Sequence, residues 1–241
     1  MDTRPATAPA NPYLDEGAAF PAPAPWQEPP YRRVGVRVLT VLAAVVALCL
    51  VAVAFALAGT AARAAEGQWA SDPAGQWRQG SVPRLYQTDP AWAEEPYAGS
   101  TMGKAGCGPT CLSAVYVAVT GRTDLTPVDA ARLSERGGHV TDGLTAWTLM
   151  DAGAASVGLS SRPVAADAGA VRAELAAGRP VIASMGPGDF TGSGHFIVLT
   201  GVDDAGRLHV MDPNSEPRTG QPWNLERTLS QARALWSFSR G

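Results

Sequence analysis

Basic residues are scarce in this chain of 241 residues, and cysteine and histidine are rarer still. Its 19 lysines and arginines are outnumbered by 22 aspartates and glutamates, and the formal net charge is −3. Because a nucleic-acid-binding domain needs a basic face, we expect no nucleic-acid partner. The three cysteines are too few for a disulfide framework, and the chain has neither a Cys-x-x-Cys pair nor a His-Glu-x-x-His zinc motif. We therefore expect no metal and no other cofactor.

The N-terminal quarter differs in composition from the rest of the chain. Residues 1–33 are rich in proline and alanine and poor in large aliphatic side chains, which predicts a disordered tail. Residues 34–60 contain an uncharged apolar run close to the ~20 residues that a transmembrane helix requires. Residues 61–80 have the glycine, serine and proline content of a linker. Residues 81–241 are long enough for one folded domain with its own core.

The charges around the apolar run predict its orientation in a membrane. Arg32, Arg33 and Arg37 precede the run, and only Arg63 follows it closely. The positive-inside rule places the N-terminus in the cytoplasm and the domain outside, as in a single-pass protein of the cell membrane. The alternative is a signal peptide cleaved near residues 62–64, although the run is longer than the usual ~7–15 apolar residues of such peptides. In both cases the domain is extracytoplasmic.

Within residues 81–241, helical patterns come first and strand patterns later, which predicts an α+β fold. Thr126 is suited to cap a helix that has Pro127 at its first position. Residues 203–206 have the composition of a hairpin turn. The expected helices are one that follows Cys107 and stops at Gly121, and then 127–135, 142–151, 167–177 and 225–235; the expected strands are 157–164, 180–185, 195–202 and 207–211.

The segment Gly106-Cys107-Gly108-Pro109 places a cysteine at the start of a helix. Pro109 suits the first helical turn, and apolar residues recur at helical spacing from there to Gly121. The unpaired N–H groups and the positive dipole end of a helix N-terminus favour an anion such as a thiolate. Cys107 is therefore a candidate nucleophile, with a buried structural cysteine as the alternative. Cys111, one turn further, is expected to be a core residue.

Of the three histidines, His195 is the best placed to act as a base for a thiol. It begins an apolar strand directly after a glycine-rich loop, whereas His209 lies within the next strand. A two-residue hairpin turn would put Asp212 diagonally opposite His195 on the same face of the sheet, and His209 on the other face. Asp212 would then accept the Nδ1 proton of His195 and leave Nε2 facing the thiol. Asn214 is the alternative orienting residue.

Attack on an amide also requires hydrogen-bond donors for the oxyanion that forms. The backbone N–H of Cys107, at the start of its helix, is one candidate donor. Gln87 is another, because its neutral side chain can donate through the amide and it lies upstream of the cysteine. Spacing alone does not connect Gln87 with the other candidates.

Four short motifs contain the candidate residues and follow one another along the chain, at residues 86–92, 106–110, 194–201 and 212–213. They read Tyr-Gln-Thr-Asp-Pro-Ala-Trp, Gly-Cys-Gly-Pro-Thr, Gly-His-Phe-Ile-Val-Leu-Thr-Gly and Asp-Pro. In these motifs the chain resembles the free-standing, peptidase-like branch of the bacteriocin-processing (double-glycine leader) cysteine peptidases, which belong to the papain-like superfamily. The resemblance implies a papain-like fold in which a nucleophile helix precedes a C-terminal antiparallel sheet.

The resemblance also implies a role for each candidate residue. Cys107 would be the nucleophile, His195 the base, Asp212 the residue that orients the base, and Gln87 a donor in the oxyanion hole. Cys111 departs from the family pattern, which usually has a small residue such as alanine or serine at that position.

Together these features predict a membrane-anchored, extracytoplasmic cysteine peptidase that hydrolyses peptide bonds through a thioester. Its partners would be a peptide or protein substrate, with cell-wall peptides included, and the membrane that holds its N-terminal helix. Two alternatives stay open: a papain-like binding module without turnover, and a Cys-His amidase or transferase that acts on cell-wall amides. The presence of all four candidate residues favours a working enzyme over a silent module.

Overall fold

The computed structural model describes residues 38, 41–53 and 67–241, and the chain divides into two units, Met1–Ala58 and Gly59–Gly241. In the N-terminal unit residues 41–53 are helical, and their large apolar side chains are exposed. Within the described ranges, no helix combines the length and the apolar character needed to cross a membrane. The predicted tail and much of the predicted membrane segment lie outside the described residues.

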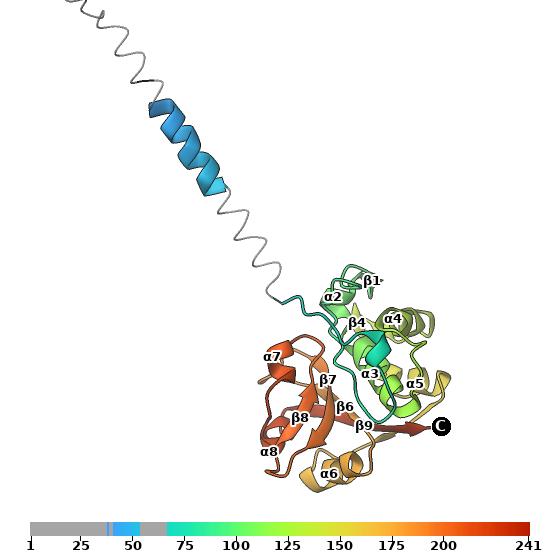
Figure 1. Ribbon diagram of the computed structural model, residues 1–241. Coiled ribbons are helices and arrows are strands. Elements are labelled where there is room, and N and C mark those ends of the chain that lie inside the picture. Colours follow the sequence, from blue (N-terminus) through green and yellow to red (C-terminus); the bar gives the residue numbers. More distant parts are fainter. Residues whose placement is uncertain (1–37, 39–40, 54–66) are drawn as a thin grey trace, which may run out of the picture. The chain divides into compact units, whose positions relative to one another are not determined.

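A five-stranded antiparallel sheet forms the centre of the C-terminal unit (Figure 1). Its strand order is β5-β9-β6-β7-β8, and each neighbouring pair is antiparallel. The predicted α+β fold with a C-terminal antiparallel sheet is therefore confirmed. The strands are β5 (Leu159–Pro163), β6 (Val181–Met185), β7 (His195–Val202), β8 (Leu208–Met211) and β9 (Ala232–Arg240).

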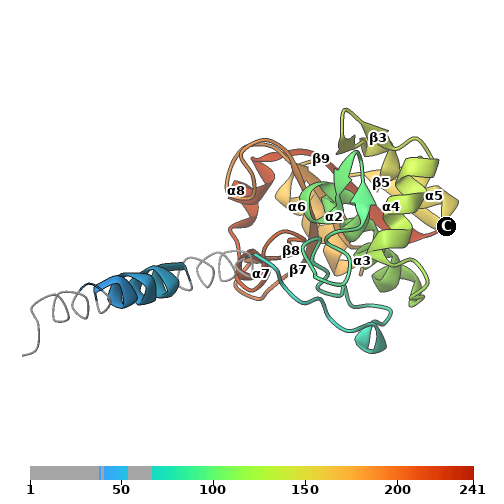
Figure 2. The ribbon, with the colours of Figure 1, turned by 90° about the horizontal axis from the view of Figure 1, so that it is seen from above.

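Helices cover both faces of this sheet, and Figure 2 shows α8 on the opposite side of the unit from α4 and α5. Alternate residues of β7 enter different cores: Phe196 and Val198 pack with α3, whereas Ile197 and Leu199 pack with α6 and α8. Residues 196–199 of this strand are all apolar because both of its faces are buried there. The helices are α2 (Met102–Ala105), α3 (Cys107–Thr120), α4 (Pro127–Arg136), α5 (Ala152–Ser156), α6 (Ala168–Ala176), α7 (Glu216–Thr219) and α8 (Leu225–Leu229); the short elements are η1 (Ala74–Gln76), η2 (Trp147–Leu149) and the strand pairs β1 (Pro96–Tyr97) with β2 (Ser100–Thr101) and β3 (Val140–Thr141) with β4 (Leu144–Thr145).

Local signals place the first long helices correctly. Gly121 ends α3 with a φ of +74°, a left-handed conformation that glycine adopts without strain. Thr126 caps α4 through a capping box, in which its side chain accepts from the N–H of Asp129 and the Asp129 carboxylate accepts from the N–H of Thr126. These two helices pack against each other, and Cys107 is the first residue of α3.

Two predicted helices are wrong. Residues 225–235 contain only the short α8, and the chain continues as β9, which lies between β5 and β6. Hydrogen bonds along both edges of β9 outweigh the local helical pattern, and its side chains enter both cores. In residues 142–151, the chain forms β4 and η2 instead of one helix. Asp142 and Gly143, with φ of 50° and 73°, form the turn between β3 and β4.

The described part of the predicted linker, residues 67–80, is hydrogen-bonded to the segment that carries Gln87. The N–H of Ser71 donates to Asp89, and the Ser71 hydroxyl accepts from the N–H of Tyr86. Asp72 accepts from the N–H and the guanidinium of Arg84. These contacts hold the chain on both sides of Gln87.

The turn of the β7–β8 hairpin is longer than predicted. The N–H of Asp203 donates to the carbonyl of Arg207, so three residues rather than two lie in the loop. The third of them, Gly206, has a φ of +77°, which a three-residue hairpin loop requires. A loop one residue longer shifts the register by one and, taken alone, would turn the predicted face of β7 away from Asp212.

A bulge in β7 restores the predicted register. Val202 pairs with Leu208 near the turn, but the pairing shifts between Leu199 and Gly201. From there Leu199 pairs with Val210, as the two-residue turn had predicted. The two errors in the sequence-based register cancel, so His195 and Asp212 reach the same side of the sheet.

Candidate active site

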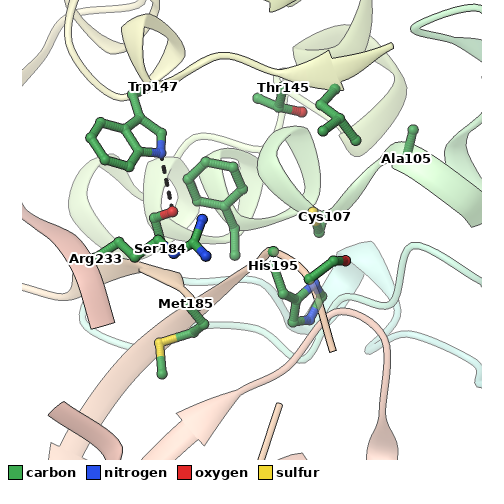
Figure 3. A pocket seen from close by; sticks show the side chains of 12 residues that line it. Ala105, Cys107, Thr145, Trp147, Ser184, Met185, His195 and Arg233 are labelled. Carbon is green, nitrogen blue, oxygen red and sulfur yellow. Dashed lines mark hydrogen bonds between the residues drawn. The ribbon is translucent and has the colours of Figure 1, made fainter. Parts of the chain in front are cut away.

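The first residue of α3, Cys107, and the first residue of β7, His195, lie next to each other in one pocket (Figure 3). The pocket has a volume of about 320 Å³. In the part of the chain that the structure describes, no three His, Cys, Asp or Glu side chains are grouped so as to hold a metal ion. The pocket is lined by Ala105, Cys107, Leu144, Thr145, Trp147, Ser184, Met185, Ser193, Gly194, His195, Phe196 and Arg233.

Two glycines allow close packing of the backbone around Cys107. A Cβ on Gly106 would lie 2.5 Å from the carbonyl oxygen of Met102, in the tight turn that joins α2 to α3. A Cβ on Gly108 would lie 2.5 Å from Cγ2 of Thr145, at the end of β4. The Gly-Cys-Gly segment therefore brings the start of α3 against the β3–β4 hairpin, which forms one wall of the pocket.

The surroundings of Cys107 favour its thiolate. Desolvation acts to raise the pKa of the Cys107 thiol, but hydrogen bonding and the charge of His195 act in the other direction. Backbone N–H groups of Phe196 and Gly108 add to this effect, and the pKa of Cys107 falls below its ordinary value. Cys111 is fully buried, and desolvation raises the pKa of its thiol well above the ordinary range. The expectation that Cys111 is a core residue agrees with this burial.

His195 is hydrogen-bonded to Asp212, with 2.7 Å between Nε2 and Oδ1. The predicted pairing of the two residues is present, but the predicted ring orientation is wrong, because Nε2 bonds to Asp212 and Nδ1 is left for the thiol. The strand register near this bond is the predicted one, with Val198 paired with Met211, so the difference lies in the orientation of the imidazole ring and not in the pairing of the strands. Although desolvation lowers the pKa of His195, hydrogen bonds and charges of Asp212 and Cys107 raise it to about 9.

Asp212 is a fully buried carboxylate, and a residue that the sequence analysis missed holds its far side. Nε of Arg218 donates to Oδ2 of Asp212 at 2.5 Å, while Oδ1 accepts from His195 and from the backbone N–H of Asn214. Burial acts to raise the pKa of Asp212, but His195, Arg218 and the N–H of Asn214 lower it below its ordinary value. The exposed side chain of Asn214 is not the partner of His195. Arg218 lies in the short α7, and no spacing rule links it to Asp212.

Gln87 is buried beside the start of α3 but does not line the pocket. Its backbone N–H donates to the carbonyl of Pro213, the residue that follows Asp212, at 2.7 Å. Its side-chain Nε2 donates to the carbonyl of Gly103 at 2.9 Å. This hydrogen bond holds the Gln87 amide at α2, the short helix that precedes Cys107 and α3.

Comparisons with known proteins identify the family of this chain. Residues 79–237 match the model of the Peptidase_C39 like family, and the chain belongs to this family. No curated protein matches the chain. Among solved structures, the peptidase domain of Streptococcus ComA, a bifunctional ABC transporter involved in a quorum-sensing pathway, is 18% identical and covers 57% of this chain and 93% of its own, with a TM-score of 0.41. A C39-like peptidase from Bacillus anthracis is 15% identical and covers 68% of this chain and 97% of its own, with a TM-score of 0.42.

We expect Cys107 to be alkylated by iodoacetamide faster than Cys111, in variants that lack Cys49. Because the pKa of Cys107 is lowered and that of His195 is raised to about 9, the thiolate–imidazolium pair is favoured over the neutral pair. The rate at Cys107 should therefore rise less steeply from pH 7 to 8.5 than the rate of an ordinary thiol, which reacts faster as the pH rises toward its pKa of ~8.5. Peptide mapping of the Cys107→Ala and Cys111→Ala variants measures each site. Equal, slow labelling of both cysteines would contradict an activated Cys107.

The replacement Arg218→Met should shift the acid limb of Cys107 reactivity to higher pH. The pKa of Asp212 rises when this guanidinium is removed, so Asp212 becomes protonated and releases His195 at a higher pH than in the unmodified chain. Arg218→Lys keeps the charge and should recover part of the shift. The control Arg207→Met removes an exposed partner of Asp203 instead and should leave the pH profile unchanged. An identical acid limb in Arg218→Met would show that Arg218 does not act through Asp212.

Proposed function

We propose that this member of the Peptidase_C39 like family is a cysteine peptidase that hydrolyses peptide bonds with Cys107, His195 and Asp212. The observation that supports this proposal best is the unbroken series of contacts from the partly exposed thiol through the imidazole to a buried carboxylate. A nucleophile, a base and a group that orients the base are the parts that covalent catalysis by a thiol requires. Cys107 and His195 line a pocket that a substrate can enter.

In the proposed reaction, the Cys107 thiolate attacks the carbonyl carbon of the substrate amide, and the carbonyl π electrons move to the oxygen. As the tetrahedral intermediate collapses, the C–N bond breaks and the amine leaves with the proton from Nδ1 of His195. The acyl group stays on Cys107 as a thioester. Neutral His195 then takes a proton from water, the hydroxide attacks the thioester, and the acid product leaves as the thiolate–imidazolium pair forms again.

Gln87 is the proposed side-chain donor of the oxyanion hole. One of its amide hydrogens is used by the carbonyl of Gly103, which also fixes which end of the amide carries nitrogen. The second hydrogen is proposed to bind the oxyanion together with the backbone N–H of Cys107 at the start of α3. A donor of this kind contributes ~3–4 kcal/mol to the stability of the transition state.

The N-terminal part of the chain is proposed to anchor the peptidase in the cell membrane, with residues 1–33 in the cytoplasm and the domain outside. The proposal is supported by the uncharged run in residues 34–60 and the arginines before it. The helical conformation of residues 41–53, with exposed valine and leucine side chains, is compatible with a lipid environment.

The replacement Gln87→Ala should lower kcat on a peptide substrate by roughly 10²- to 10³-fold with little change in KM, because the donor acts on the oxyanion rather than on the bound substrate. Cys107→Ala should remove hydrolysis altogether. The control Gln79→Ala changes a glutamine that donates to the carbonyl of Val119 on the far end of α3 and should keep full activity. Steady-state kinetics with a peptide library identify the substrate and measure each variant. A Gln87→Ala enzyme with unchanged kcat would remove Gln87 from the mechanism.

The full chain, expressed in bacteria, should sediment with membranes and resist extraction by alkaline carbonate. A protease added to spheroplasts should digest the domain, because it lies on the outer side. Replacing Arg32, Arg33 and Arg37 with glutamate should reduce this accessibility, since these charges set the orientation. A soluble chain that begins near residues 62–64 would instead identify a cleaved signal peptide.

A further inference from the structure

The pocket beside Cys107 and His195 has a chemical character that amide hydrolysis alone does not require. Leu144 and Trp147 are 66% and 48% exposed. Among the described residues 67–241 they are the exposed large apolar side chains, and both line this pocket. Large apolar groups that are exposed together at one place mark a binding surface. The wall formed by β4 and η2 is therefore suited to an apolar side chain of the substrate.

Trp147 is held in one orientation. Its indole Nε1 donates to Oγ of Ser184 at 3.1 Å, and its ring meets the edge of Trp236 at 5.7 Å between centroids. An aromatic side chain that is already ordered loses little conformational entropy when a ligand binds, and such residues dominate the binding energy of many interfaces. Trp147 therefore presents a preformed binding surface and does not have to change its orientation when a ligand binds.

Arg233 supplies a positive charge on the same pocket. In Figure 3, Arg233, Ser184 and Trp147 lie on one side of the pocket, and Cys107 and His195 lie on the other. Apart from Arg233, the only ionisable groups that line it are Cys107 and His195, and no aspartate or glutamate does. Arg233 lies in an exposed part of β9, and no ion pair joins it to a carboxylate within the described residues.

The surroundings of Arg233 keep this charge available to a ligand. A Cβ on Gly186 would lie 2.9 Å from Nε of Arg233, so glycine at this position leaves the space through which the side chain passes. Asp189, the acidic residue of the adjoining loop, already accepts hydrogen bonds from Arg227 and Gln231. The guanidinium of Arg233 is therefore free to pair with a carboxylate of the substrate.

We propose that the peptidase selects substrates that carry an acidic side chain, together with a large apolar one, within a few residues of the scissile amide. The carboxylate pairs with Arg233, and the apolar side chain packs against Trp147 and Leu144. A pocket of about 320 Å³ is near the lower end of the ~300–1,000 Å³ range of ligand pockets, which suits a few side chains of an extended peptide. This inference rests on the proposed function for the position of the amide, but the binding that it describes does not require turnover.

The test compares peptides that differ only in charge. A series of eight-residue peptides with amidated C-termini carries one glutamate, moved through each position, beside leucine, and a matched series carries glutamine. With the full chain in detergent, the best glutamate peptide should have a kcat/KM about tenfold higher than its glutamine partner, as a charge-assisted hydrogen bond predicts. In the Arg233→Gln variant this ratio should fall to about one. In Arg233→Glu a lysine peptide should become the better substrate.

Two further variants separate the charge effect from structural damage. Arg136→Gln removes an exposed arginine at the end of α4, outside the pocket, and should keep the glutamate preference. Gly186→Ala leaves the charge of Arg233 in place but displaces its side chain, and it should weaken the preference. A peptide with a free C-terminus and no glutamate tests whether Arg233 pairs with the C-terminal carboxylate of the substrate instead of with an acidic side chain. If only the free C-terminus raises kcat/KM, the claim for an acidic side chain is overturned.

A binding measurement keeps this inference distinct from the proposed function. Calorimetry with the Cys107→Ala chain compares the glutamate and glutamine peptides without turnover. Preferential binding of the glutamate peptide without cleavage by the unmodified chain would support the inference and contradict the peptidase function. Cleavage with equal kcat/KM for both peptides would support the peptidase function and contradict the inference about acidic side chains. Absence of both binding and cleavage across the series would overturn both.

Discussion

Asp212 carries a negative charge with no exposed surface, and the site depends on the groups that compensate this charge. An isolated buried carboxylate would take up a proton rather than remain ionised. Here Nε2 of His195, the N–H of Asn214 and Nε of Arg218 surround it, and the pKa of Asp212 stays below its ordinary value. Against desolvation, the ionised carboxylate and Cys107 together raise the pKa of His195 to about 9, and the imidazolium favours the thiolate of Cys107. The charge state of the nucleophile thus follows from a carboxylate that the solvent does not reach.

The sheet determines where these charges meet. The two cores on its faces fix β7 between α3 on one side and α6 and α8 on the other, so the first residue of β7 arrives at the first residue of α3. The short hairpin of β3 and β4 packs against the start of α3 at Gly108, and Arg233 comes from β9, an inner strand of the sheet. The pocket is therefore built from segments of the chain that are far apart in sequence. The reactive residues come from α3 and β7, whereas the residues proposed to bind the substrate side chains come from β4, η2 and β9.

Local patterns were enough for several elements. Pro127 and the Thr126 cap predicted α4, Gly121 predicted the end of α3, and the apolar run 195–202 predicted β7 with its observed bounds. Local patterns failed at β9, where leucines at helical spacing continue into a strand that two neighbours stabilise. They also failed for the β7–β8 turn, where the loop is one residue longer than predicted and a bulge in the same strand pair, between Leu199 and Gly201, compensates for it.

The sequence by itself determined which residue types are present to react: a cysteine at a helix start, a histidine at a strand start and an aspartate after the next strand. It determined this because helix caps, strand periodicity and turn residues act over a few positions. Only the tertiary structure decided that Nε2 of His195 is the nitrogen bonded to Asp212, that Arg218 compensates this carboxylate, and that Arg233 faces the same pocket. These outcomes depend on contacts between distant segments, whose relative positions are set by the packing of both cores and not by any local pattern.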